Sequence, residues 1–246
     1  MNETTLQSIL SGTRRAVTYT HPIVNLKDGD TKAQEMLTRF PGDDGRMRTV
    51  GWLLEDISLA PALRAQLDLL CVGSVFEALA RNPITTHLVF VNLSPLTLQH
   101  PEFWNKLQSW VWDLPIPPHR IVLELTEVFV QHDPEHMEGA ARRLRDLGLR
   151  VAVGDLGAGI ASLAGMARLA PDFIKLDRSL VRDVHRRPYQ AAMLNGLAVF
   201  AERMRVGCIA EGIETMAELQ AVIDADVPWG QGYLFGHPEP LREPVA

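Results

Sequence analysis

The chain has 246 residues, of which 46% are apolar, and its formal net charge at pH 7 is −6. This length and apolar content allow a large core, either in one α/β domain or in two small ones. The negative charge excludes bulk electrostatic attraction to nucleic acid or to an anionic membrane surface. A phosphate-bearing ligand would therefore have to be held locally, by an arginine, a metal ion or backbone amides.

Residues 1–15 lack a basic start followed by an apolar core, and no apolar run approaches the ~18 residues of a membrane span. Cys71 and Cys208 stand far apart in apolar surroundings, which is typical of buried thiols in a reducing compartment. We therefore expect a cytoplasmic protein without a membrane segment. No shift in composition marks a linker, so we expect an extension over 1–15 and a single domain over 16–246.

In chain order, short apolar runs alternate with longer helical patterns. The predicted strands lie near residues 14–26, 31–40, 87–94, 120–127, 150–155, 172–177, 205–211 and 229–235. The predicted helices lie near residues 59–79, 133–147, 189–203 and 215–225, and Asp133 and Gly148 are the expected ends of the second. Eight strands with intervening helices in ~250 residues are typical of a TIM-type (β/α)8 barrel. A doubly wound open sheet would give a similar pattern.

A polar residue stands at the C-terminal end of each predicted strand from the second to the eighth. These residues are Glu35, Asn92, Glu124, Asp155, Lys175, Glu211 and Gln231. In a barrel the seven side chains would converge on one rim, although any one of them could instead be a solvated loop residue. Carboxylates and an amide without histidine suit Mg²⁺ or Mn²⁺ rather than Zn²⁺. A lysine beside them would hold phosphate charge, so the set indicates metal-assisted attack on a phosphodiester.

The sequence also resembles the EAL-domain phosphodiesterases of bacterial cyclic di-GMP signalling, from about Tyr19 to Leu241. The similarity rests on ordered motifs: Glu35-Met36-Leu37-Thr38-Arg39, Val91-Asn92-Leu93-Ser94-Pro95, Glu124-Leu125-Thr126-Glu127, Ile174-Lys175-Leu176-Asp177-Arg178, Ala210-Glu211-Gly212-Ile213-Glu214-Thr215 and Gln231-Gly232-Tyr233-Leu234-Phe235-Gly236. The resemblance implies a TIM-type barrel with an antiparallel first strand. It also implies hydrolysis of cyclic di-GMP to pGpG with Mg²⁺ or Mn²⁺, inhibition by Ca²⁺, and a homodimer.

The resemblance further implies a role for each motif residue. Glu35, Asn92, Glu124 and Asp155 would ligate metal, and Lys175, Glu211 and Gln231 would position water, supported by Glu214. Arg39 would grip a ligand phosphate, Leu37, Asp177 and Gln231 would complete the substrate site, and Glu127 would anchor the loop after Asp155. Purely structural roles remain open for several of these residues. Arg39 could form a rim salt bridge, Lys175 could pair with Asp177 or Glu211, and Glu214 and Glu127 could be structural.

One departure from the family pattern falls where the predicted strand near residues 150–155 runs into the following loop. The family's loop begins with two aspartates, whereas this chain has Gly154 followed by Asp155. Loss of a carboxylate shared by two cations should weaken at least one metal site and slow turnover by ~10²–10³. We therefore expect slow hydrolysis. The alternatives are a cyclic di-GMP receptor without turnover and a protein-interaction module that no longer uses the ligand.

Overall fold

The computed structural model describes residues 3–42, 44–49, 51, 59–84, 86–126, 134–157, 166 and 168–241. The strands are β1 (Val17–Asn25), β2 (Thr31–Pro41), β3 (Met47–Thr49), β4 (Leu88–Leu93), β5 (Ile121–Thr126), β6 (Arg150–Leu156), β7 (Phe173–Leu176), β8 (Gly207–Ala210), β9 (Trp229–Gln231) and β10 (Glu239–Pro240). The helices are α1 (Glu3–Leu10), α3 (Pro61–Arg81), α4 (Phe103–Asp113), α6 (Pro134–Asp146), α8 (Arg178–Val181), α9 (Pro188–Met204) and α10 (Met216–Asp224).

Eight of the strands close into a barrel. The sheet runs in the order β10-β1-β9-β8-β7-β6-β5-β4-β2-β3, and the additional pairing of β1 with β2 completes the circle. β1 is antiparallel to both of its barrel neighbours, whereas the strands from β2 through β4 to β9 are parallel. The closed topology confirms the predicted TIM-type barrel with an antiparallel first strand and excludes the open doubly wound sheet.

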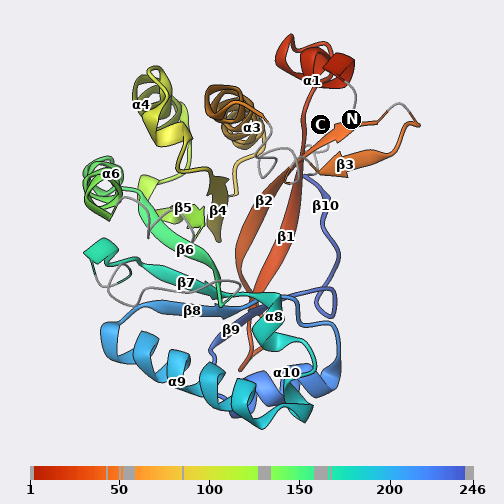
Figure 1. The fold of residues 1–246 in the computed structure, drawn as a ribbon, viewed down its shortest axis with the longest axis vertical. Coiled ribbons are helices and arrows are strands. Elements are labelled where there is room, and N and C mark those ends of the chain that lie inside the picture. Colours follow the sequence, from red (N-terminus) through yellow and green to blue (C-terminus); the bar gives the residue numbers. More distant parts are fainter. Residues whose placement is uncertain are drawn as a thin grey trace.

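The barrel interior is filled at one end by side chains from seven different strands. These side chains are Ile23, Ala33, Phe90, Val122, Ala152, Phe173 and Ile209. Larger apolar clusters lie between the barrel and its helices, with α3, α4 and α6 on one side and α9 and α10 on the other (Figure 1). The polar side chains that follow these apolar residues on the same parallel strands lie at the C-terminal end of the barrel, which is called its upper end below.

β1 and β2 form a long hairpin whose two faces have different surroundings. Ile23 of β1 and Ala33 of β2 face the lumen, and strand alternation places Tyr19, His21, Glu35 and Arg39 on that same face. Phe40 faces outward into a small cluster with Leu6 and Ile9 of α1. The hairpin therefore separates the barrel lumen from the packing of α1 and α3.

The predicted helices are all present among the described residues, and three further α-helices, α1, α4 and α8, were not predicted. α4 has buried Phe103, Leu107 and Val111 at a spacing of four residues, which is a regular amphipathic pattern. α1 lies within the segment expected to be an extension and packs on α3. Asp133, the expected cap of α6, lies outside the described residues. No helix among the described residues is long and apolar enough to cross a membrane.

Candidate functional site

Lys175 lies at the centre of the polar cluster at the upper end of the lumen. Its side chain is 1% exposed, and its ammonium lies 2.5 Å from Glu211 Oε1, 2.9 Å from Glu124 Oε2 and 3.3 Å from Glu35 Oε2. The lysine and the three glutamates come from β2, β5, β7 and the end of β8. The pairing of Lys175 with Glu211 was one of the structural alternatives, and no ion pair of Lys175 with Asp177 is present among the described residues.

Two amide side chains extend the cluster across the rim. Asn92 Nδ2 donates to Glu35 Oε1 at 2.7 Å, and Gln231 Nε2 donates to Glu35 Oε2 at 2.7 Å. Gln231 Nε2 also lies 2.9 Å from Nδ1 of His21, whose Nε2 contacts the Gly236 carbonyl at 3.1 Å. The Gln231 carbonyl oxygen is buried and has no hydrogen-bond partner among the described residues. It is therefore available to a ligand or a water at the site.

Burial opposes the ion pairs in setting the charge of this cluster. Burial raises the pKa of Glu124 to about 8, with Glu35 and Glu211 adding to the shift and Lys175 opposing it. Burial also raises the pKa of Glu211. For Glu35, burial is outweighed by Lys175 and by two amide hydrogen bonds, which hold its pKa below the usual value. Burial would lower the pKa of Lys175, but the three carboxylates hold it well above the usual value. One ammonium thus serves three carboxyl groups, and burial favours the protonated form of Glu124 and Glu211.

Asp155 reaches the site through an irregularity in β6. The pairing of β6 with β7 shifts register between Val153 and Leu156, and Asp155 has a left-handed backbone with φ of 57°. Such a bulge turns an extra side chain out of the ladder, and bulges of this kind are frequent beside active sites. Carboxylate oxygens of Asp155, Asp177 and Glu211 lie within 4.8 Å of one another. This spacing and chemistry fit a divalent cation with oxygen ligands.

The remaining predicted residues surround these two groups. Arg39 lies over the Tyr19 ring, with its Cζ 4.4 Å from the ring centroid, and its Nε is buried without a hydrogen-bond partner among the described residues. Leu37 pairs with Tyr19 across the hairpin. Glu214 forms an ion pair with Arg178 at 3.0 Å. Arg39 therefore forms a cation–π contact and no rim salt bridge within the described part of the chain.

Some residues behave in ways that the sequence did not indicate. Asp177 also caps α8, where its Oδ1 accepts a hydrogen bond from Ser179 N at 2.8 Å. Its presence beside Asp155 and Glu211 could have been inferred only from the fold, because it directly follows β7 at the same rim. Glu127, the predicted loop anchor, lies outside the described residues.

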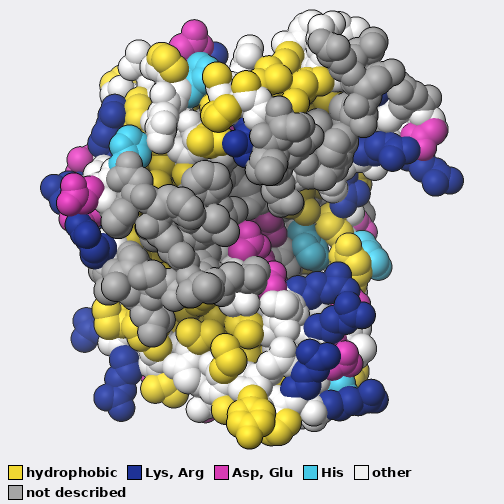
Figure 2. Space-filling view, viewed as in Figure 1, with side chains coloured by type: hydrophobic (Ala, Val, Ile, Leu, Met, Phe, Trp, Pro, Cys, Tyr) yellow, Lys and Arg dark blue, Asp and Glu magenta, His cyan; other side chains and the backbone are white. Residues whose placement is uncertain are grey.

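The cluster opens to a cavity of about 190 Å³ lined by His21, Glu35, Arg178, Glu211, Gly212, Glu214, Gln231, Gly232 and Tyr233. In the view of Figure 2 acidic side chains gather near the middle of the face, beside a histidine, and basic side chains lie below them. The structure thus brings the seven strand-end residues to one rim, where a divalent cation and a phosphate could meet. Their individual roles remain predictions.

Comparison with known proteins gives consistent matches. The family model described as the EAL domain matches residues 4–238. The probable cyclic di-GMP phosphodiesterase PdeA of Escherichia coli (strain K12) is 29% identical over 250 residues, covering 98% of this chain and 34% of that protein. The probable cyclic di-GMP phosphodiesterase PdeB of the same organism is 29% identical over 229 residues, covering 90% of this chain and 42% of that protein. The chain thus spans less than half the length of either relative.

Solved structures show the same barrel. BlrP1 of Klebsiella pneumoniae, in a complex with calcium and cy-diGMP, superimposes with a TM-score of 0.83 at 26% identity, covering 92% of this chain and 56% of that one. A manganese and cy-diGMP complex of BlrP1 gives the same values. The FimX EAL domain from Pseudomonas aeruginosa, bound to c-di-GMP, has a TM-score of 0.84 at 20% identity, covering 98% of both chains, and supports the fold alone.

Proposed function

Because the chain belongs to the EAL domain family, we propose that it binds cyclic di-GMP and hydrolyses it to pGpG with a divalent cation, Mg²⁺ or Mn²⁺. The observation that carries the proposal is the convergence of Glu35, Asn92, Glu124, Lys175, Glu211 and Gln231 on one rim, with Asp155 beside them. The metal complexes of BlrP1 support the kind of cation and ligand.

The residues present fit divalent cations in two different ways. Asp155, Asp177 and Glu211 offer three carboxylates at a common point. Glu35, Asn92 and Glu124 offer oxygen ligands as well, but Lys175 already neutralises part of their charge. When bound, divalent cations would activate water and stabilise the charge that develops on the phosphate.

The chain's own groups would divide the remaining work. The Arg39 guanidinium is positively charged, lies against Tyr19 and has an Nε without a hydrogen-bond partner among the described residues, so it would hold a phosphate of the dinucleotide. The Lys175 ammonium would orient the attacking water and hold the carboxylates in place. The Gln231 carbonyl would accept a hydrogen bond from that water, because its amide is fixed by Glu35 and His21. Glu214, held by Arg178, would support the rim.

A receptor without turnover is the second candidate, and Gly154 favours it. Gly154 lies buried next to Glu124 and supplies no carboxylate at a place where the family resemblance leads us to expect an aspartate. Binding through Arg39 does not depend on that carboxylate. Hydrolysis does, so we expect activity to be reduced.

The test is incubation of the purified chain with cyclic di-GMP and Mn²⁺, with pGpG measured by chromatography, beside a calorimetric titration of cyclic di-GMP in Ca²⁺. Glu35→Gln is the matched control, because it keeps the shape of the side chain and removes its charge. Turnover that this variant loses supports the enzyme, and binding without turnover supports the receptor. If the chain neither hydrolyses nor binds cyclic di-GMP, both the enzyme and the receptor are ruled out. A protein-interaction module then remains.

Self-association and location belong to the same proposal. α9, which follows Asp155 in the chain, exposes Tyr189 (88%), Met193 (53%) and Met204 (52%), an apolar surface suited to a second copy. A parent that sediments as a dimer while Met193→Glu sediments as a monomer would support a homodimer through α9. A monomeric parent would contradict it.

The buried free thiols of Cys71 and Cys208 agree with a cytoplasmic, reducing location.

A further inference from the structure

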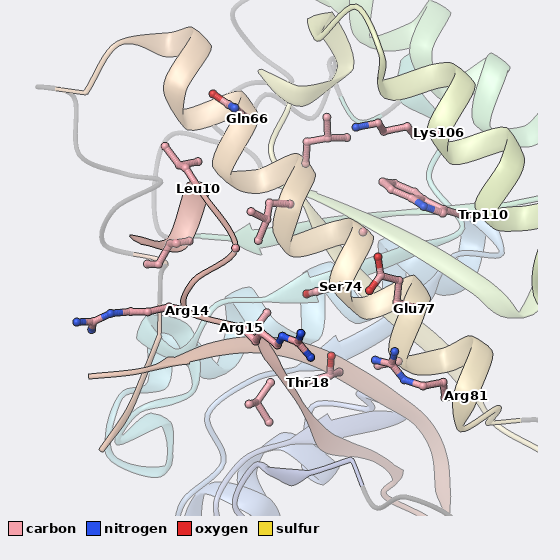
Figure 3. A pocket seen from close by; sticks show the side chains of 18 of the residues that line it. Leu10, Arg14, Arg15, Thr18, Gln66, Ser74, Glu77, Arg81, Lys106 and Trp110 are labelled. Atoms are coloured by element: carbon pink, nitrogen blue, oxygen red, sulfur yellow. The ribbon is translucent and has the colours of Figure 1, made fainter. Parts of the chain in front are cut away.

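A second, larger cavity lies on the outer face of the β1–β2 hairpin. Its volume is about 750 Å³, within the usual range for small-molecule sites, and it shares no lining residue with the cavity beside Lys175. Its walls come from α1, the segment before β1, the start of β1, one face of α3 and part of α4 (Figure 3). Thr18 lines it, whereas the alternate residues Tyr19 and His21 belong to the lumen face.

The cavity is positively charged although the chain as a whole is negative. Its basic residues are Arg14, Arg15, Arg81 and Lys106, and its acidic residues are Glu77 and Glu102. The ion pair of Lys106 with Glu102 at 2.7 Å removes one charge of each sign. Arg15 and Arg81 then stand against the single carboxylate of Glu77, so the cavity keeps a net positive charge that suits an anion.

Two of these arginines are placed to act together. In Figure 3, Arg15 and Arg81 reach into the cavity from the two sides of Thr18. Neither arginine has an ion pair within the described part of the chain, whereas Arg14 donates to the Pro41 carbonyl at 3.0 Å. A pair of guanidinium groups with a neighbouring hydroxyl matches a phosphate, which carries nearly two charges and several acceptor oxygens.

The opposite wall is apolar and contains a fixed indole ring. Trp110 stacks on Phe76 with 5.4 Å between ring centroids. It also lies so close to Gly73 that a Cβ there would come 2.9 Å from Trp110 Cζ2. Leu69 and Leu70 of α3 continue this wall. A rigid aromatic surface of this kind packs well against a planar ring.

We propose that this cavity is a binding site for a small aromatic phosphate. The phosphate lies between Arg15 and Arg81 beside Thr18, and the ring packs in the apolar part of the cavity with Trp110. The site is separate from the proposed cyclic di-GMP site and does not depend on divalent cations.

The test is an NMR titration of the ¹⁵N-labelled chain with phenyl phosphate in the absence of divalent cations, beside titrations with inorganic phosphate and benzyl alcohol. We expect saturable shifts at the amides of Thr18, Gly73 and Ser74 and at the Trp110 indole. Phenyl phosphate should bind at least about tenfold more tightly than either half-ligand, because both ends of the site contribute.

Two sets of variants decide the outcome. Arg15→Gln combined with Arg81→Gln should weaken binding of phenyl phosphate about tenfold or more, and Trp110→Leu should weaken it as well. Arg203→Gln, an exposed arginine on α9, is the matched control and should bind like the parent. The proposal is overturned if no saturable binding occurs, if the shifts centre on Glu35 and Gln231, if the double variant binds like the parent, or if inorganic phosphate binds as tightly. A failure of cyclic di-GMP binding would leave these results unchanged.

Discussion

The Glu124 carboxylate occupies the space beside Gly154 that a side chain at that position would fill. A Cβ on Gly154 would overlap Glu124 Oε1 and would come 3.1 Å from its Cδ. The absence of a side chain at residue 154 thus allows Glu124 to take the position in which it pairs with Lys175.

Substitutions at Gly154 separate the effect of space from the effect of charge. Gly154→Ala should displace the Glu124 carboxylate without adding charge, and we expect a loss of about 1–3 kcal/mol in stability together with weaker Mn²⁺ binding. Gly154→Asp should displace the same carboxylate but add another, so it should bind Mn²⁺ more tightly than the parent and hydrolyse cyclic di-GMP faster. Titration of free Mn²⁺ by electron paramagnetic resonance measures the affinities. Equal Mn²⁺ affinity in Gly154→Asp and the parent would contradict this account of the site.

Removal of the buried ammonium should destabilise the chain strongly. Lys175→Met leaves three buried carboxyl groups without their common partner, and the expected loss is about 3–5 kcal/mol in the free energy of unfolding. Without the ammonium, the folded state takes up protons at higher pH than the unfolded state does, so the loss should shrink as the pH falls. Urea unfolding at several pH values checks this. Lys32→Met, on the surface, should show no such pH dependence, and an equal loss at every pH would argue against the ion pairs.

Asp68 of α3 should make stability depend on pH. Burial raises its pKa to about 6 although it accepts hydrogen bonds from Thr97 Oγ1 at 2.6 Å and from Ser94 N at 2.9 Å. Because the folded state holds this proton more tightly than the unfolded state, the stabilising contribution is present below pH ~4 and is lost as the pH rises through 6. The loss is on the order of 3 kcal/mol.

The Asp68→Asn variant tests this directly. Its stability should change less than that of the parent between pH 4 and pH 7, by the amount that Asp68 contributes. Thermal unfolding followed by circular dichroism gives both curves, and Asp113→Asn on the surface is the control. Parallel curves for Asp68→Asn and the parent would rule out the role of Asp68.

The contact of Arg39 with Tyr19 should govern nucleotide affinity. Arg39→Lys keeps the charge but loses the planar fork and its contact with the ring, so cyclic di-GMP should bind about tenfold more weakly in Ca²⁺. Tyr19→Phe keeps the ring and should bind like the parent, whereas Tyr19→Leu should weaken binding. Calorimetry distinguishes these cases. Unchanged affinity in Arg39→Lys would remove Arg39 from the phosphate site.

The barrel was predictable because its strands are consecutive apolar runs and its helices are amphipathic. The polar residues were predictable for a related reason: parallel strands end at one rim, so Glu35, Asn92 and Glu124 had to meet there once the barrel was assumed. Closure itself did not follow from the pattern, because an open sheet has the same alternation of elements. The antiparallel direction of β1 came only from the family resemblance.

Most partners of the individual side chains could not be predicted. The pairing of Lys175 with Glu211 was one of two alternatives taken from the sequence, but the contacts of Lys175 with Glu35 and Glu124 depend on rotamers and distances across the lumen, which sequence spacing does not show. Asp68 lies within an apolar helix face, and its partners Ser94 and Thr97 are distant in the chain, so nothing marked it as a buried carboxyl group. The relation of Gly154 to Glu124 likewise joins residues on different strands.

The hairpin of β1 and β2 has the barrel lumen on one face and the outer cavity on the other. Val17 pairs with Arg39 and Thr18 with Thr38, so the residues of β1 that border the outer cavity are in register with the part of β2 that carries Arg39. Thr38 Oγ1 in turn donates to the Cys71 carbonyl of α3 at 3.4 Å. A displacement of the paired strands β1 and β2 toward α3 would change the outer cavity and the barrel lumen together, because the same backbone hydrogen bonds hold the residues that line each of them.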